Sequence, residues 1–264
     1  GGMLEPMATT RAALTGKTYV FTSAQNNTEV HTPFFKALKV YCAHNDAELI
    51  IGQFTYNKSG FQNGTNEGDE IYYAPELKNY FRTQSLDVLP DLVWCGELNI
   101  LPTSKFPLTG LGQYTGTASS IVPHAKITLE SVANSKLERT KLMYSTGCLT
   151  QRNYIQRKAG QLAETMHCYG ALVVEVKEDG SWFARQIQTD ETGVFQDLKN
   201  LYHPTGQVTV APIDAIHWGD IHAEELDPSV KEACFEKGGM LDDILPNYQL
   251  FLDVSNFSAR NHHN

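Results

Sequence analysis

The stretch that decides the fold runs from Lys17 to Tyr56 and reads KTYVFTSAQNNTEVHTPFFKALKVYCAHNDAELIIGQFTY. Residues 17–23 are typical of a strand, and Thr32 followed by Pro33 indicates a helix start, with the threonine as cap and the proline at the first helical position. Residues 48–56 alternate into a second strand. The helix between them, ending near residue 44, carries an apolar stripe formed by Phe34, Leu38 and Tyr41. The stretch therefore predicts a strand, helix and strand unit, and with it an α/β fold.

The loop that follows the first strand, residues 23–28 (SAQNNT), falls at the carboxyl end of that strand. Ligands of open α/β sheets bind at this edge, so the amide side chains are candidates for reading a base or a sugar. The alternative is a solvated turn, because Asn and Ser are common turn residues.

The chain beyond this unit predicts a mixed, largely parallel sheet domain. We expect an exposed excursion over 57–75, a helix over 75–81, strands over 92–95, 127–132 and 141–146, and a hairpin of 171–176 with 182–188 around Lys177-Glu178-Asp179-Gly180. The long connection 101–124 is rich in Thr, Gly and Pro, and such segments are functional or irregular. It ends at His124, a candidate ligand, although a lone histidine is more often a structural hydrogen-bonding group.

Two further motifs carry candidate chemistry. Ser145-Thr146-Gly147-Cys148 suggests a nucleophile, but no paired base can be named from its spacing, so a structural Cys148 is the preferred interpretation. Arg152, Arg157 and Lys158, with an aromatic residue between them, form the most basic stretch and are the best candidates for contacting a nucleic-acid backbone. A solvated helix face is the alternative.

Near the C-terminus, residues 208–218 and 248–254 are predicted strands that flank a helix-competent segment with Pro228 in its first turn. A crossover of this length implies parallel neighbours, which brings Asp220 and Asp253 to the same sheet edge. Asp220 and His222 lie two positions apart in an extended chain end and so point to one side. Carboxylates and imidazoles suit Mn, Fe, Zn or Mg.

Gly219-Asp220-Ile221-His222, then Asp253, then Asn261-His262, resembles the opening of the calcineurin-like metallophosphoesterase family. The resemblance implies a site for two divalent metals, with manganese expected first. Asp220 and His222 would hold one metal, Asp253 would bridge, Asn261 would hold the other, and His262 would act beside the phosphate. The later histidine ligands of the family have no counterpart before Asn264. We therefore expect residues 206–264 to be only the first βαβ part of a metallophosphoesterase sandwich.

Residues 17–202 resemble phage proteins that carry an α/β domain before a phosphoesterase domain, including the pre-early host-DNA-degradation and DNA-transfer nucleases of large coliphages. The resemblance implies a DNase that acts on host DNA in the host cytoplasm. A non-enzymatic module that binds nucleic acid or a host protein, and a phosphodiesterase for small nucleotides, are the alternatives. Homo-oligomerisation is left open.

Composition sets the remaining bounds. The 264 residues, 41% hydrophobic and 19% charged, are ordinary for globular domains. A net charge of −9 argues against binding of nucleic acid by positive charge spread over the whole chain, though it is compatible with a local basic patch. Five scattered cysteines indicate reduced thiols, and no apolar run suggests a membrane span. We expect a lead-in over 1–16, an α/β domain over 17–205 and a second domain over 206–264. Gly1-Gly2-Met3 resembles a tag remnant, which favours a designed fragment.

Overall fold

The computed structural model describes residues 17–58, 70–132, 140–211, 215–218 and 248–251. The chain divides into two compact units, the first made of Gly1–Phe195 with His203–Gly206 and the second of Gln196–Tyr202 with Gln207–Asn264. The first unit also includes His203–Gly206, which spans the expected boundary between residues 205 and 206.

The predicted strand, helix and strand unit opens the first unit. It consists of β1 (Thr18–Gln25), α1 (Thr32–Asn45) and β2 (Ala47–Phe54), with β1 and β2 paired in parallel along their whole length. The predicted threonine cap of α1 is wrong. His31 occupies the cap position, and its ring nitrogen accepts a hydrogen bond from the backbone N–H of Phe34. A ring nitrogen therefore satisfies one of the N–H groups that a helix start leaves without a partner.

A four-stranded sheet with the order β2-β1-β8-β9 is built on this unit. β8 (Gly170–Val176) pairs antiparallel with β1, and β9 (Trp182–Gln188) pairs antiparallel with β8. The hairpin between β8 and β9 is the one predicted from the turn residues 177–180. Gly180 has a φ of +84°, a conformation that side chains disfavour, which explains the glycine there.

A five-stranded sheet with the order β3-β4-β5-β7-β6 forms the other layer. Its strands are β3 (Ser85–Leu89), β4 (Leu92–Cys95), β5 (Ser119–Val122), β6 (His124–Val132) and β7 (Lys141–Gly147). The sequence predicted β4, β6 and β7 but not β3 or β5. β5 has only four residues, all of them buried, so it shows none of the alternation by which a half-buried strand is recognised. Its place inside the Thr- and Gly-rich connection concealed it further.

Two further helical elements follow α1 in the described part of the chain. The helix predicted over 75–81 is a 3-10 helix, η2 (Pro75–Tyr80), and α2 covers Lys158–Met166. Both sheets mix parallel and antiparallel pairs, as the α/β prediction requires, and antiparallel pairs are more frequent than predicted. No helix within the described ranges is long and apolar enough to cross a lipid bilayer.

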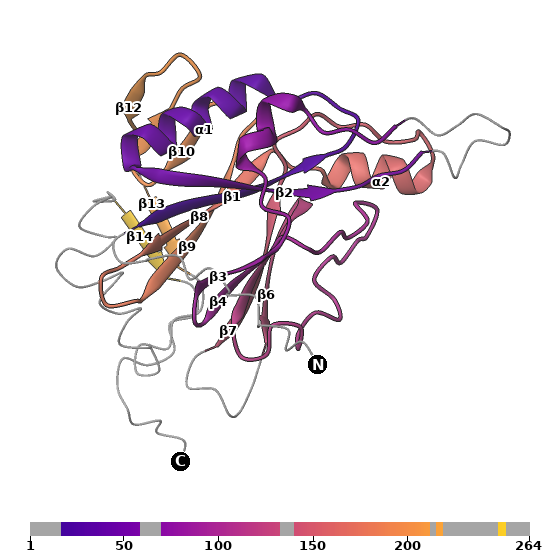
Figure 1. Cartoon of the computed structure of the whole chain (residues 1–264). Helices are drawn as coiled ribbons and strands as arrows, with labels where there is room; N and C mark the ends of the chain where they lie inside the picture. The colour runs from indigo at the N-terminus through magenta and orange to yellow at the C-terminus, as the bar shows by residue number, and fades with distance from the viewer. Residues whose placement is uncertain (1–16, 59–69, 133–139, 212–214, 219–247, 252–264) are drawn as a thin grey trace, which may run out of the picture. The chain divides into compact units, whose positions relative to one another are not determined.

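The core of the first unit lies between its two sheets. Tyr19 and Phe21 of β1 contribute to this core, and the ring of Phe21 stacks on that of Trp94 with 5.2 Å between centroids. Val20 is equally buried and points to the opposite face, as strand geometry requires. There α1 lies along the sheet (Figure 1) and buries its apolar stripe. β1 is therefore buried on both faces.

The second unit contains two small sets of strands in its described part. β11 (Asn200–Tyr202) pairs antiparallel with β12 (Val208–Val210), and β10 (Phe195–Asp197) completes that sheet. β13 (Ala215–Trp218) and β14 (Tyr248–Phe251) pair in parallel. The single strand predicted over 208–218 is therefore wrong, because 208–210 pairs in another sheet. The predicted parallel pairing is confirmed.

Replacing Phe21 by alanine should lower the free energy of unfolding by about 3–5 kcal/mol, because the change leaves a cavity against Trp94 that the two sheets cannot close. Leu129→Ala on β6 is the control, since that side chain is 52% exposed, and it should change stability by no more than about 0.5 kcal/mol. Urea unfolding followed by tryptophan fluorescence measures both. Equal, small effects would contradict a core centred on Phe21.

Candidate functional site

The predicted metal ligands Asp220, His222, Asp253, Asn261 and His262 lie outside the described residues. The described part of their neighbourhood is the β13/β14 pair, in which Trp218 pairs with Phe251 at the last position of each strand. Whether the ligands gather beyond those strand ends stays a prediction.

Within the part of the chain that the structure describes, no group of three or more His, Cys, Asp and Glu side chains is arranged to hold a metal ion. The acidic and imidazole groups of the first unit are instead dispersed or bonded to the protein itself. The predicted metal ligands lie outside the described residues, so the metal site stays a prediction.

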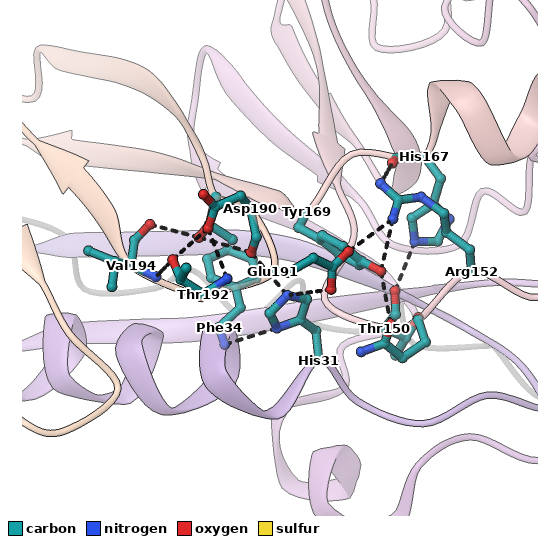
Figure 2. A network of polar contacts seen from close by, with 12 residues as sticks. His31, Phe34, Thr150, Arg152, His167, Tyr169, Asp190, Glu191, Thr192 and Val194 are labelled. Atoms are coloured by element: carbon teal, nitrogen blue, oxygen red, sulfur yellow. Dashed lines mark hydrogen bonds and ion pairs between the residues drawn. The ribbon is translucent and has the colours of Figure 1, made fainter.

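Arg152, a predicted nucleic-acid contact, is bound inside the first unit (Figure 2). Its three nitrogens donate to the carbonyl of Glu164 at 3.2 Å, the hydroxyl of Tyr169 at 3.1 Å and the carbonyl of His167 at 2.9 Å. The guanidinium also lies 4.5 Å from the centre of the Tyr169 ring and 3.5 Å from the carboxylate of Glu191. These contacts give Arg152 a structural role, and few of its donors remain for a phosphate.

His167 lies beneath Arg152 and is 1% exposed. Its Nε2 lies 2.8 Å from the carbonyl of Thr150, to which it donates, and its Nδ1 accepts from the Tyr154 hydroxyl at 2.6 Å. Burial lowers the pKa of His167 to about 3. Burial also raises the pKa of Tyr154. Both groups are therefore neutral and fully bonded, and neither is placed to act as a base on a ligand.

His31 ties the start of α1 to the loop that follows β9 (Figure 2). Because its Nδ1 accepts from Phe34, its Nε2 carries the proton and donates to the carbonyl of Asp190 at 3.1 Å. Gly193 of the same loop has a φ of +77°, and a side chain there would meet the backbone of Pro33. This contact requires glycine and holds residues 190–194 against the helix start.

The two motifs with an alternative chemical interpretation are structural. His124 is fully buried, bonds the Leu101 carbonyl through Nε2 at 3.1 Å and accepts from the Lys126 N–H at Nδ1, and burial lowers its pKa to about 4. Cys148 is buried beside Thr150, and burial raises the pKa of its thiol. A neutral, buried thiol is a poor nucleophile. The cysteines at 42, 95, 148 and 168 are all free thiols.

The amides of the loop after β1 are used by the protein. Asn26 is 3% exposed, accepts from the Tyr56 N–H at 2.7 Å and donates to the Tyr56 carbonyl at 3.2 Å. Asn27, in the left-handed region with a φ of 53°, bonds the backbone of Glu70 and Tyr72. These side chains bond neighbouring segments of the protein, which argues against base recognition. The alternative of a solvated turn is wrong in one respect, because the loop is almost entirely buried.

Arg157 and Lys158, the other predicted nucleic-acid contacts, are exposed at the N-terminus of α2, where Arg157 is the cap residue. A pocket of about 330 Å³ lies beside this helix start, and Arg157 is part of its wall. The opposite wall comes from segments that follow β2 and β4, including Tyr56, Asn99, Leu101 and Thr103. Sequence reasoning missed this pocket, because its wall is assembled from three segments far apart in the chain.

Arg152→Ala should lower the free energy of unfolding by about 1–2 kcal/mol, because two carbonyl groups and a hydroxyl lose a charged donor in part-buried or exposed hydrogen bonds. Arg152→Lys should restore only part of it, since an ammonium group lacks the planar fork of donors. Arg157→Ala is the matched control and should stay within about 0.5 kcal/mol of the parent chain. Urea unfolding of the three variants decides, and an Arg152→Ala chain as stable as the control would contradict the structural role.

Acid should destabilise the chain from pH 6.5 downward. His124 and His167 have folded-state pKa values of about 4 and about 3, below the ordinary value of about 6.5 for an unfolded chain. The unfolded state therefore binds more protons between those values, and stability falls as pH drops, by up to about 1.4 kcal/mol per pH unit for each histidine. Urea unfolding between about pH 7 and 5 measures the slope. His124→Asn keeps an acceptor for the Lys126 N–H. It should reduce the slope of stability against pH by the contribution of about one proton. An unchanged slope would contradict the lowered pKa of His124.

The chain is 42% identical over 259 residues to protein A1 of Escherichia phage T5, an alignment that covers 94% of this chain and 46% of that protein. It therefore spans about half the length of the curated relative that it matches. No protein-family model matches the chain, and no solved structure matches it. The match relates the chain to a phage protein, and none of these comparisons connects it to metallophosphoesterases.

Proposed function

We propose that the chain belongs to a phage enzyme that hydrolyses phosphodiester bonds with divalent metals, a DNase acting on host DNA. The observation that carries the proposal is the parallel pairing of β13 with β14, which ends at Trp218 opposite Phe251. Asp220 and Asp253 each follow these paired residues by two positions in the sequence. Equal offsets from the ends of two parallel neighbours favour two carboxylates at one sheet edge, where ligands of α/β sheets bind.

The donor set suits hard or borderline divalent metals. Carboxylate oxygens, an imidazole and an amide oxygen, from Asp220, Asp253, His222 and Asn261, are ligands for Mn, with Mg, Fe and Zn as alternatives. Such a metal, when bound, polarises the phosphoryl group and lowers the pKa of water. His262 would protonate the leaving oxygen, which is the role of a general acid.

The relative supports the phage context of this proposal and the substrate remains our inference. The name of the relative, protein A1, states no activity. We propose polynucleotides rather than small nucleotides as the substrate, because the first unit also exposes Arg157 and Lys158, which suit an extended phosphate backbone. A chain that cleaved small nucleotide diesters but no polynucleotide would favour the phosphodiesterase alternative.

Manganese binding and hydrolysis of bis(4-nitrophenyl) phosphate and of DNA should both depend on Asp220 and Asp253. We expect Asp220→Ala and Asp253→Ala to abolish hydrolysis, because each removes a carboxylate that neutralises the metal, and to weaken Mn binding measured by calorimetry. Asp179→Ala is the matched control, since this carboxylate lies in the β8/β9 turn and bonds only its neighbour Ser181.

The assay should be run on this chain beside a version extended past Asn264, because the family resemblance places further ligands later in the sequence. Activity in the extended version alone, lost in Asp220→Ala, would mean that residues 206–264 hold part of the site. Unchanged Mn binding in both aspartate variants would refute the metal site.

A further inference from the structure

An exposed phenylalanine stands between two lysines on the first unit. The Phe106 ring is 60% exposed, and the ammonium groups of Lys105 and Lys126 lie 5.5 Å and 5.7 Å from its centre. The residues that follow it, Pro107 and Leu108, are buried. An aromatic ring held at the surface by buried neighbours is unlike the side chain of a free loop, and two ammonium groups lie over this ring.

Hydrogen bonds hold this arrangement on the five-stranded sheet. The Lys126 ammonium donates to the Lys105 carbonyl at 2.8 Å. Two positions earlier in β6, buried His124 bonds the Leu101 carbonyl at 3.1 Å. The segment from Leu101 to Phe106 is thus fastened to β6 near both of its ends. The ring is therefore presented in a fixed position, which lowers the entropy lost when a ligand binds.

The pocket beside α2 adjoins the same segment. Leu101 and Thr103 are part of its wall, and Thr103 precedes Phe106 by three residues, at most about 11 Å of extended chain. On the other side of the pocket Arg157 and Lys158 are exposed. Arg157 is thus in the pocket wall with Lys158 next to it in the sequence, and Phe106 follows the wall residue Thr103 by three positions.

These side chains are positively charged, although the chain as a whole is acidic. The net charge of the chain is −9, yet the four cations Lys105, Lys126, Arg157 and Lys158 form no ion pair with a carboxylate in the part of the chain that the structure describes. Two of these cations, Lys105 and Lys126, lie at the exposed Phe106 ring. A ring and nearby cations are the two groups that a single nucleic-acid strand needs, a π-face for its bases and positive charge for its phosphates.

We propose that this surface, made of Phe106, Lys105, Lys126 and the pocket wall with Arg157 and Lys158, binds single-stranded DNA. One base stacks on Phe106 with its phosphates beside the two lysines, and a neighbouring nucleotide enters the pocket with its phosphate toward Arg157. Bases of a duplex are stacked on each other, so their faces cannot reach Phe106. The choice of DNA rests on the proposed nuclease function. The proposal gives the first unit the role of binding an unpaired strand.

The test is fluorescence anisotropy of a labelled oligo-dT of about 12 nucleotides with the whole 264-residue chain, in EDTA so that nothing is cleaved. Phe106→Ala should weaken binding by about 5- to 150-fold, the range for loss of one stacked base. Phe106→Trp should bind as well as the parent chain. Tyr114→Ala is the matched control, an exposed aromatic whose hydroxyl bonds the carboxylate of Glu97, and it should bind within about twofold of the parent.

The salt dependence tests the cations. Each of Lys105→Gln, Lys126→Gln and Arg157→Gln should lower the slope of log affinity against log salt by about 0.7, the value for one phosphate of a single strand. Equal binding by Phe106→Ala and the parent chain, or equal affinity for a duplex of the same length, overturns the proposal. Phe106-dependent binding, when neither this chain nor the version extended past Asn264 cleaves DNA with Mn, would refute the proposed nuclease and support this surface. Cleavage without Phe106-dependent binding would support the nuclease and refute this surface.

Discussion

The structure of the first unit depends on burying β1 on both of its faces. Phe21 stacks on Trp94 across the gap between the sheets, while the residues that alternate with it face α1. A strand in this position can exchange its backbone hydrogen bonds only with neighbours on either side, and β2 and β8 supply them. This strand positions the loop after β1 and the starts of α1 and α2. The candidate surfaces of the first unit therefore depend on it.

Buried polar groups then fix the connections that the sheets leave irregular. His31, His124 and His167 each donate a hydrogen bond to a backbone carbonyl from one ring nitrogen and accept a hydrogen bond at the other. A neutral imidazole satisfies one donor and one acceptor of nearby backbone without burying a charge. The same groups in an exposed cluster would suggest metal or proton chemistry. Here their hydrogen bonds and burial indicate that they stabilise the fold.

The sequence alone predicted the elements that local signals specify. Proline after threonine marked the start of α1 to within one residue, and the turn residues 177–180 marked the β8/β9 hairpin. The parallel β13/β14 pair followed from the length of its crossover. β3, β5 and the pocket could not be found in this way, because they depend on which distant segments meet. The role of Arg152 was equally hidden, since a basic residue near an aromatic one reads as a phosphate contact until its partners Tyr169 and His167 are seen.

Charge links the fold to the proposed activity. An acidic chain repels DNA at long range, so a strand must be captured by a small surface on which cations outnumber carboxylates locally. Such a surface captures weakly and with strong salt dependence, which suits an enzyme that must release each product strand. Stacking on Phe106 adds affinity that screening does not weaken and that a duplex cannot obtain. A surface of this kind in the first unit and a metal site in the second would select unpaired DNA before any bond is broken, so substrate choice and chemistry would depend on different residues.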